Sequence, residues 1–476
     1  MRTNLRIREN DWTELRKLVA SSFRSARRAE KGAIGLLGYN FTKDRRELLV
    51  TKIIWPNSDD IKTASAGRLE FSSSYVRRAH LEARISGLSG IVTFHTHPYS
   101  DDSVGFSGFD SREDAELMAN LEEIHPGTFL CSVVLGRTSQ AGCLRTFLGG
   151  RQDLSSLVVV GERLQVLALD GKPMPSAPPA AAFFDRALAL SSTGALAILS
   201  EMVIVVVGVG GTGSLLCELL ARSGAKKLIV IDHDVMADVN VNRVLYSTVT
   251  DVSLRVHKVD VIKRIEQLGL GVTIETIKTS VLDADVWSEV RRADVVFGCV
   301  DRGLPRQLLS LFSRQFLRPY IDLGSEIGLN QDGVASLDSR VSFVNPSRPC
   351  LKCTGVVSGR QLAFESQSKE ERSRIVALGY SDDLILKQPA VMELNMRSAS
   401  TASLLLRDLL QPTLLRPLPL TFLENALTYS TRRITTARTP STTCAVCAAN
   451  PHTGFGECGP EIGFSTEIAK DLTDAA

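Results

Sequence analysis

Residues 202–213 read MVIVVVGVGGTG, a run of branched apolar residues that passes directly into a glycine-rich turn. The apolar run predicts a strand that is buried on both faces. The glycines permit a tight turn and let backbone amides approach phosphate groups at the start of the next helix. They are Gly208, Gly210, Gly211 and Gly213. Asp232 ends the next predicted strand, where a carboxylate can bind a ribose hydroxyl. This pattern alone is typical of a dinucleotide-binding domain, with NAD as the default ligand.

The sequence around this turn alternates between strand and helix patterns. We expect helices over residues 214–223 and 259–268, and strands over 203–207, 228–231, 272–277 and 294–299. This order predicts an α/β domain with a mostly parallel, doubly wound sheet.

The sequence before the turn predicts a separate α/β domain. Strand patterns cover residues 34–39, 47–54, 90–94 and 128–135, and a helix pattern covers 112–121. Residues 170–182 read DGKPMPSAPPAAA, which is typical of a linker. We therefore expect a first domain over 1–168, a linker over 169–182, a second domain over 183–450 and a loose tail over 451–476.

Composition excludes several classes of protein. With 476 residues we expect two or three domains, and 44% hydrophobic with 23% charged residues excludes a mainly disordered chain. A net charge of +2 gives no bulk argument for nucleic acid, and no apolar run is long enough to span a membrane. The N-terminus lacks the apolar core of a secretory signal. Nine cysteines, an odd number, favour a reducing compartment, so we expect a cytoplasmic protein.

The first domain contains a candidate metal site in residues 91–110, IVTFHTHPYSDDSVGFSGFD. His95 and His97 are two residues apart, so both side chains point to one side of an extended chain. Pro98 then ends the strand, and Asp110 can supply an oxygen ligand. Two histidines and one carboxylate leave a fourth position for water, which is the pattern of a catalytic zinc site. The alternative is a pair of surface histidines in a polar loop.

This segment resembles the JAMM (JAB/MPN) metalloprotease signature H-x-H-P…S-x-x-D. The resemblance implies zinc on the two histidines and Asp110, with Ser107 stabilising the oxyanion and Glu30, before the glycine-rich strand pattern KGAIGLLG, as the general base. The spacing differs from the usual signature, because eight residues separate Pro98 from Ser107.

Residues 232–243, DHDVMADVNVNR, resemble the D-x-D…N-x-x-R stretch of the ubiquitin-activating and ThiF/MoeB adenylyltransferase superfamily. The resemblance implies a nucleotide site formed by Asp232, Asp234, Asn240, Arg243 and Lys258. It also implies a magnesium-associated acid at Asp301 and, at Arg186 in the sequence FDR, an arginine that reaches into the partner subunit of a homodimer.

The charges of these residues suit ATP. Joining a carboxylate to the α-phosphate brings two anions together, so the site needs Mg²⁺ and several cations. Arg186, Arg243 and Lys258 would supply positive charge, Asp301 would hold the magnesium, and Asp232 would hold the ribose.

Four cysteines form two C-x-x-C pairs in the second domain. They are Cys350, Cys353, Cys444 and Cys447. Two such pairs predict a closed, structural Cys₄ zinc site, whereas a single pair would also suit a redox centre. We expect this site to tie a late hairpin near residues 417–433 to the body of the domain.

Many relatives carry a further cysteine between the two pairs that accepts the activated carboxylate as a thioester. This chain has no cysteine between Thr354 and Thr443. Either activation ends at the acyl-adenylate or another thiol takes over, and Cys458 in the tail is then the candidate.

The combined resemblances imply a bifunctional enzyme of a bacterial ubiquitin-like pathway. It would adenylate the C-terminal glycine of a small modifier with ATP and Mg²⁺, and its zinc protease domain would cleave the bond after that glycine. A conjugating-enzyme-like protein is an expected further partner. Sulfur-carrier activation for cofactor synthesis, and an adenylating enzyme with an inactive protease-like scaffold, are the alternatives. An NAD-dependent oxidoreductase fits less well, because Arg243, Lys258, Asp301 and the cysteine pairs have no role in it.

Overall fold

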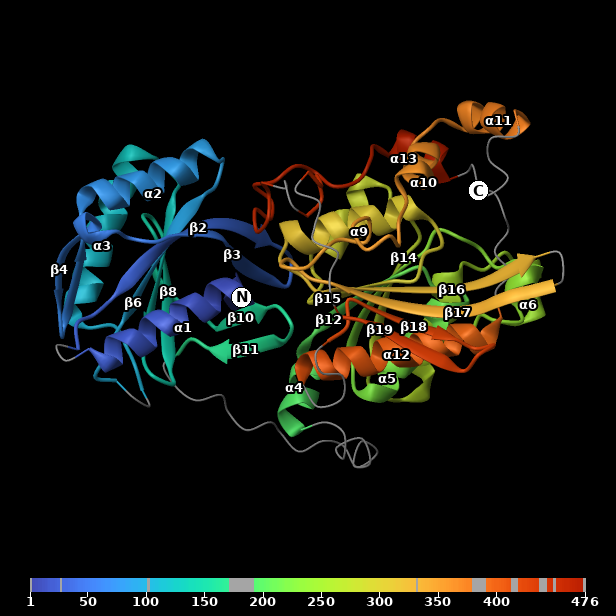
Figure 1. Ribbon diagram of the computed structural model, residues 1–476, viewed down its shortest axis with the longest axis horizontal. Helices are drawn as coiled ribbons and strands as arrows, with labels where there is room; N and C mark the ends of the chain where they lie inside the picture. Colours follow the sequence, from blue (N-terminus) through green and yellow to red (C-terminus); the bar gives the residue numbers. More distant parts are fainter. Residues whose placement is uncertain are drawn as a thin grey trace. The chain divides into compact units, whose positions relative to one another are not determined.

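The computed structural model describes residues 2–25, 28–100, 103–170, 192–330, 333–378, 391–411, 418–435, 443–447 and 451–473. The chain divides into two compact units (Figure 1). The first unit comprises Met1–Pro175, Gln315–Leu317 and Pro451–Pro460, and the second comprises the remainder.

The first unit is built on a nine-stranded mixed sheet with the strand order β11-β10-β1-β3-β2-β6-β7-β8-β9. Its strands are β1 (Arg2–Arg8), β2 (Gly32–Phe41), β3 (Arg45–Ile54), β6 (Gly90–Thr96), β7 (Phe129–Leu135), β8 (Gln140–Thr146), β9 (Gly150–Asp153), β10 (Ser156–Val160) and β11 (Leu164–Ala168). β4 (Ile61–Ser65) and β5 (Arg68–Phe71) form a separate two-stranded sheet. The four strands and the helix that we expected in this domain are all present; β2, β3, β6 and α3 (Gly108–Ile124) are longer than expected, and β7 begins one residue later.

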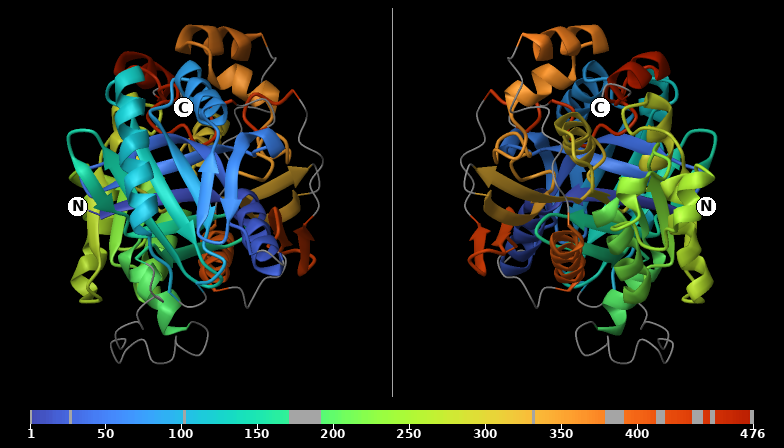
Figure 2. Two further views of the ribbon diagram at one scale, coloured as in Figure 1. Left: turned by 90° about the vertical axis from the view of Figure 1, so that its left-hand side faces the viewer. Right: turned by 90° about the vertical axis from the view of Figure 1, so that its right-hand side faces the viewer.

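Helices cover both faces of the nine-stranded sheet (Figure 2, left). On one face α1 (Glu9–Arg24) buries Leu15 and Val19. On the other face α2 (Ser73–Ile85) and α3 (Gly108–Ile124) bury Tyr75 and Met118. β2 alternates between the two, because Ile34 and Leu36 join the second core whereas Ala33 and Leu37 join the first.

The second unit is built on an eight-stranded sheet with the order β14-β13-β12-β15-β16-β17-β18-β19. Its strands are β12 (Val203–Val207), β13 (Lys227–Ile231), β14 (Thr273–Ile277), β15 (Val295–Gly298), β16 (Tyr320–Asn330), β17 (Gly333–Val344), β18 (Thr421–Asn425) and β19 (Ser430–Ile434). β12 to β16 are parallel and doubly wound about β12, as the alternating pattern predicted. β17 to β19 are antiparallel, and β18 and β19 form the expected late hairpin.

Helices lie on both sides of this second sheet (Figure 1). The helices of the unit are α4 (Thr193–Glu201), α5 (Gly211–Ser223), α6 (Val249–Ser253), α7 (Lys258–Ile262), α8 (Trp287–Val290), α9 (Gly303–Gln315), α10 (Gly359–Glu365), α11 (Lys369–Ala377), α12 (Met392–Leu410) and α13 (Thr466–Thr473). The helix expected over 259–268 is an α-helical turn, α7, followed by a 3₁₀ helix, Lys263–Leu268, which ends at Gly269 in the left-handed conformation.

The folded part of the first unit extends beyond the predicted start of the linker. Leu169 is buried in the first core, and its carbonyl oxygen accepts a hydrogen bond from the Gly142 N–H at 2.9 Å. Asp170 forms an isolated bridge with Ala141. The remainder of the predicted linker, residues 171–182, lies outside the described residues.

The C-terminal segment is an ordered part of the fold, in contrast to the loose tail that we expected. Phe455 is buried among side chains of β2, α2 and α3. Beside β2, the Tyr39 carbonyl accepts the Glu457 N–H at 2.8 Å, and the Phe41 N–H donates to the Glu457 carboxylate at 2.6 Å. The segment therefore contributes a core side chain to the first unit, which a reading of local glycine content could not reveal.

None of the described helices is both long and apolar enough to cross a membrane.

Candidate functional site

The parallel strands of the second unit bring the predicted nucleotide-binding residues to one edge of the sheet. Val207 pairs with Ile231 on one side and with Gly298 on the other. The segments that follow these strands therefore leave the sheet together, and they carry Gly208, Asp232 and, two residues after Cys299, the exposed Asp301. In doubly wound sheets this carboxyl edge is where ligands bind.

The glycine-rich turn is shaped so that a ligand can approach its backbone. Gly208 has a φ of +85°, and a Cβ at this position would lie 2.8 Å from the Cys299 carbonyl oxygen. At Gly213 a Cβ would collide with the carbonyl of Gly208. Beside Gly210, by contrast, no atom of the described residues lies within 4 Å of a built Cβ, and none of their side chains caps the N-terminus of α5. This open, uncapped helix start fits a phosphate group.

Asp232 holds the turn in place. It is 9% exposed, and its carboxylate accepts the Val209 N–H at 2.8 Å and the Asp234 N–H at 2.9 Å. Burial raises the pKa of Asp232, and the nearby Lys258 ammonium opposes that shift. The residue expected to bind ribose therefore also orders the backbone of the site.

Lys258 pairs with Asp234 at the start of α7. Its ammonium lies 2.6 Å from the Asp234 carboxylate, and its backbone N–H donates to the Asp234 carbonyl at 3.0 Å. Although burial raises the pKa of Asp234, Lys258 outweighs burial, and the pKa falls below its ordinary value. Since Lys258 is 8% exposed, its charge is fixed beside the glycine-rich turn.

Of the other motif residues, the structure describes Asn240 and Arg243 but not Arg186. Asn240 is buried and its side-chain oxygen accepts the Ala237 N–H at 3.1 Å, so it shapes the loop. Arg243 donates to the Val239 carbonyl, and its side chain passes beside Gly211. Arg186 lies outside the described residues.

Sequence reasoning missed Asn395 on α12. Its side chain is buried against the glycine-rich turn, where its oxygen accepts the hydroxyls of Thr212 at 3.0 Å and Ser325 at 2.9 Å. A Cβ on Gly211 would collide with its amide nitrogen. We assigned no role to this asparagine from the sequence, because a single polar residue within a helix does not by itself indicate a site.

The first unit brings His95, His97 and Asp110 together as predicted. The two carboxylate oxygens of Asp110 lie 3.5 Å from Nε2 of His95 and 3.4 Å from Nε2 of His97. One ligand atom from each residue lies within 4.8 Å of the others. Nε2 of His95 is buried and has no hydrogen-bond partner among the described residues. A metal ion would supply the missing partner, and this set of two imidazoles and a carboxylate fits zinc.

Glu30 lies beside this cluster although it is far from it in sequence. Gly32 pairs with His95, and Lys31 accepts the Thr96 N–H through its carbonyl at 2.9 Å, which brings the start of β2 to the end of β6. A Glu30 carboxylate oxygen lies 3.9 Å from Nε2 of His97, and the other is buried without a partner in the described part of the chain. Burial raises the pKa of Glu30 to about 7.

Ser107 is the N-cap of α3, and it orients Asp110. Its hydroxyl accepts the Asp110 N–H at 3.1 Å, and its own N–H donates to the Asp110 carboxylate at 2.6 Å. This reciprocal pair fixes the carboxylate that faces the histidines. The long spacing between Pro98 and Ser107 therefore leaves the His–His–Asp cluster intact.

The four cysteines of the second unit also come together as predicted. The sulfurs of Cys350 and Cys444 are 3.7 Å apart, and those of Cys353 and Cys447 are 3.4 Å apart. Disulfide sulfurs are about 2.05 Å apart, whereas four sulfurs on a zinc ion with bonds of about 2.3 Å are about 3.8 Å apart. Although burial raises the pKa of Cys444, the N–H groups of Cys447 and Val446 lower it to about 7. The cluster fits a tetrahedral metal.

Residues 184–450, more than half of the chain, match the ThiF family. Over 166 residues the chain is 25% identical to ubiquitin-like modifier-activating enzyme 5 of Bombyx mori, and this match covers 32% of this chain and 40% of that protein. Over 81 residues it is 38% identical to the tRNA threonylcarbamoyladenosine dehydratase of Bacillus subtilis (strain 168), which covers 17% and 31%. The chain thus matches less than half the length of these curated relatives. The structure of E. coli MccB with ATP is 18% identical, with a TM-score of 0.43 over 56% of this chain and 74% of that one.

Proposed function

This chain belongs to the ThiF family, and on that premise we propose that its second unit adenylates a carboxylate with ATP and Mg²⁺. The observation that carries the proposal is the meeting, at one sheet edge, of an open glycine-rich turn with the Asp234–Lys258 pair and Asp301. A nucleotide phosphate would occupy the space beside Gly210, at the start of α5.

The reaction joins two anions, and the site supplies the charge that this requires. An oxygen of the substrate carboxylate bonds to the α-phosphorus, the bond from that phosphorus to the bridging oxygen breaks, and pyrophosphate leaves. Lys258 and Arg243 would offset the negative charge of the phosphates. Mg²⁺ held by Asp301 would supply further positive charge. Arg186 from the second copy in a homodimer would complete the set.

The substrate that we propose is the C-terminal glycine of a small ubiquitin-like protein. The partial identity with ubiquitin-like modifier-activating enzyme 5 supports this class. A sulfur-carrier protein is the alternative substrate. The absence of a cysteine between Thr354 and Thr443 fits this alternative at least as well as it fits a ubiquitin-like protein. The experiment that separates them is incubation with ATP and each class of carrier, followed by trapping of the acyl-adenylate with hydroxylamine.

For the first unit we propose metal-dependent hydrolysis of the peptide or isopeptide bond after that glycine. The observation that carries this proposal is the position of Glu30 beside the His–His–Asp cluster. Its buried carboxylate lies 3.9 Å from Nε2 of His97, and burial raises its pKa. Zinc held by that cluster would act as a Lewis acid on the scissile carbonyl. Glu30 would take a proton from the attacking water and pass it to the leaving amine as the C–N bond breaks.

Two variants separate the two proposed activities. Asp301→Ala should abolish ATP–pyrophosphate exchange and leave peptide cleavage intact, whereas His97→Ala should do the reverse. Loss of both activities in either variant would contradict the two-site proposal. Cleavage by His97→Ala would mean that the hydrolytic metal site is elsewhere, whereas an absence of cleavage by the unchanged protein would favour an inactive scaffold.

A further inference from the structure

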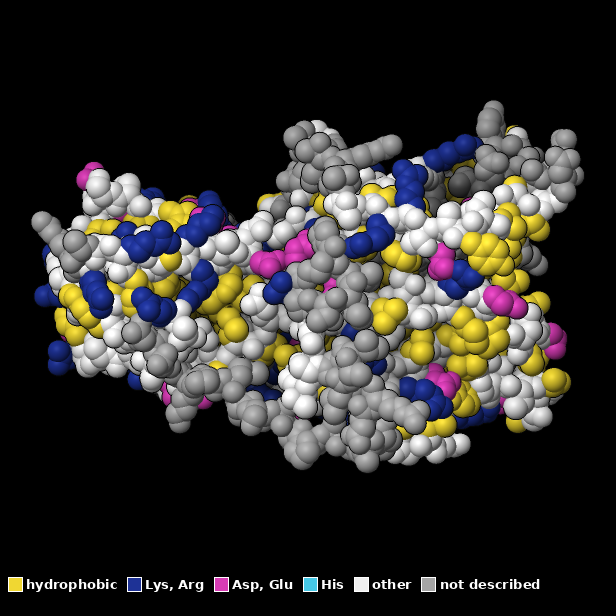
Figure 3. Space-filling model, turned by 60° about the horizontal axis from the view of Figure 1, so that its bottom comes forward, with side chains coloured by type: hydrophobic (Ala, Val, Ile, Leu, Met, Phe, Trp, Pro, Cys, Tyr) yellow, Lys and Arg dark blue, Asp and Glu magenta, His cyan; other side chains and the backbone are white. Residues whose placement is uncertain are grey.

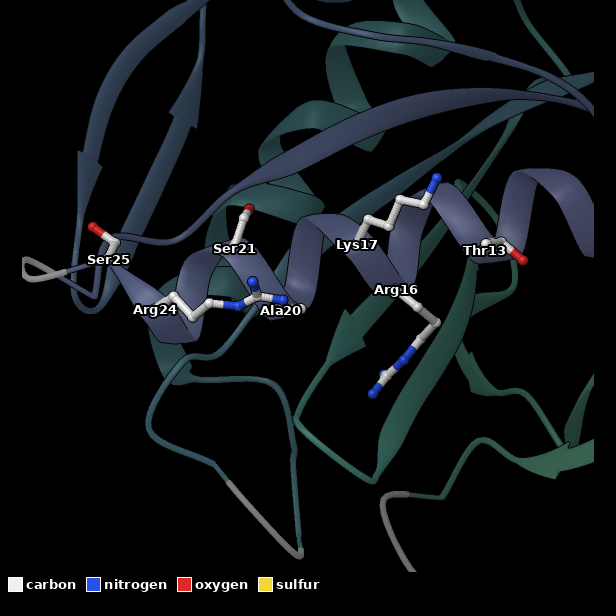
Figure 4. A pocket seen from close by; sticks show the side chains of 7 residues that line it. All are labelled: Thr13, Arg16, Lys17, Ala20, Ser21, Arg24 and Ser25. Atoms are coloured by element: carbon white, nitrogen blue, oxygen red, sulfur yellow. The ribbon is translucent and has the colours of Figure 1, made fainter.

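The outward side of α1 carries a hollow lined by cations and small side chains (Figure 4). Its volume is about 660 Å³, and its lining follows the helical repeat: Thr13, Arg16, Lys17, Ala20, Ser21, Arg24 and Ser25. A second hollow of about 220 Å³ adjoins it and is lined by Arg16, Val19, Ala20, Phe23, Arg24 and Arg137. Among the residues that the structure describes, no Asp or Glu lines either hollow.

The cations of this surface are weakly neutralised. Arg16 donates to the carbonyls of Gly136 and Arg137, which carry no net charge. Arg24 is exposed and makes no ion pair within the described ranges. Lys17 pairs with Glu14 at 2.7 Å, but both side chains are more than half exposed (67% and 53%), and such pairs are weak. The hollow therefore offers positive charge to a ligand.

The last turn of α1 lies directly behind the metal cluster. Ser21, which lines the hollow, accepts a hydrogen bond from the Lys31 ammonium at 2.9 Å, and Lys31 follows Glu30. Ser22 bonds at 3.0 Å to Thr96, the residue between the two histidines. Tyr99 comes two residues after His97. Beyond the helix, the guanidinium of Arg28 lies over the ring of Tyr99, 5.5 Å from its centre. The surface formed by Arg16, Lys17, Arg24 and Arg28, here called the basic track, thus runs from α1 towards the cluster.

We propose that the basic track is the docking surface for an acidic polypeptide, whose chain then enters the cluster of His95, His97 and Asp110. This inference rests on the hydrolase function proposed above and names the chemistry of its substrate. Guanidinium groups recognise carboxylates through paired hydrogen bonds. The small floor residues Ala20 and Ser21 leave room for a polypeptide backbone.

The aromatic residues of this region favour a polypeptide over single-stranded nucleic acid, which binds by stacking its bases on rings. Arg16 lies 5.7 Å from the centre of the Trp12 ring, and Arg137 lies 5.0 Å from that of Phe23. Arg28 covers Tyr99 in the same way. Each ring thus has a face occupied by a guanidinium.

On the face in Figure 3, Lys and Arg side chains are spread widely over the first unit at the left, with few Asp or Glu.

The test uses the full chain and three fluorescent probes: an oligoglutamate peptide, an oligoglutamine peptide of equal length and a single-stranded DNA oligonucleotide. Fluorescence anisotropy should give a dissociation constant for oligoglutamate about tenfold below those of the other two. Lys17→Ala and Arg24→Ala should each weaken that binding about threefold to tenfold. Arg46→Ala is the matched control. Arg46 is an exposed arginine that lies over the ring of Phe41, and Phe41 is at the end of β2 opposite to the end that adjoins the cluster.

Equal binding of the two peptides, tighter binding of the DNA, or unchanged binding after Arg24→Ala would overturn the proposal. A cleavage assay separates this result from the fate of the hydrolase proposal, using peptides with a central Gly-Gly flanked by Glu or by Gln. A protein that prefers oligoglutamate but cleaves neither substrate supports the basic track and contradicts the hydrolase. A protein that cleaves both equally and binds both peptides alike supports the hydrolase and overturns the track.

Discussion

The ammonium of Lys258 lies 2.6 Å from the carboxylate of Asp234, beside Asp232 and the glycine-rich turn. The pair arises because the start of α7 and the end of β13 meet at the carboxyl edge of the sheet. Asp234 holds the lysine in place through both its side chain and its carbonyl. A positioned cation at this edge is what the proposed chemistry at phosphate requires.

Lys258→Met should reduce ATP–pyrophosphate exchange by about 100-fold, because removal of a positioned cation from a charged transition state costs about that factor. It also leaves Asp232 and Asp234 without their cation, so the affinity for ATP should fall. Lys263→Met is the control, since that ammonium binds the Ile274 carbonyl. An equal loss of exchange in both variants would argue against a specific role for Lys258.

Glu30→Gln should separate metal binding from hydrolysis in the first unit. The amide keeps the size of the side chain but cannot accept the proton, so cleavage should fall by about 100-fold or more. Zinc measured by mass spectrometry should stay at two ions per chain if both clusters bind. His95→Ala should lose one of them, whereas His125→Gln, outside the cluster, should lose none. Retention of full zinc by His95→Ala would place that metal elsewhere.

Gly210→Ala and Gly213→Ala should fail in different ways. A methyl group at Gly213 meets the Gly208 carbonyl, so we expect a loss of about 1–3 kcal/mol in the free energy of unfolding. A methyl group at Gly210 meets open space, so the melting temperature should hardly change while ATP binding falls. Calorimetry and nucleotide titration of both variants measure this difference. Normal ATP binding by Gly210→Ala would mean that phosphate does not occupy that space.

Phe455→Ala should destabilise the first unit although it lies near the end of the chain. Removing a buried phenylalanine side chain costs about 3–5 kcal/mol, and Phe455 packs among β2, α2 and α3. The unfolding transition of the first unit should therefore move to lower denaturant concentration, and ATP–pyrophosphate exchange should persist. Phe147→Ala, at an exposed position, is the control. An unchanged transition would show that the C-terminal segment is not needed by this core.

Local patterns in the sequence were sufficient for the parts of the molecule whose chemistry lies in short segments. The apolar run and glycines of residues 202–213 predicted a buried strand, a tight turn and a helix, and β12 and α5 follow that pattern. The spacing of His95 and His97 and of the two cysteine pairs predicted which side chains could share a metal, because a few residues of backbone limit where those side chains can point.

Tertiary structure decided the contacts between segments that are distant in sequence, and of those named here only the place of Glu30 was expected beforehand, from a family resemblance and not from its spacing. Glu30 reaches His97 because β2 pairs with β6, Asn395 reaches the glycine-rich turn because α12 packs against α5, and Phe455 fills a core formed hundreds of residues earlier. Sheet pairing and core packing determine such contacts, and neither leaves a local periodic signal at the residues involved. The sequence thus determined the chemical groups and their local directions, whereas the pairing of strands and the filling of the cores determined which groups meet.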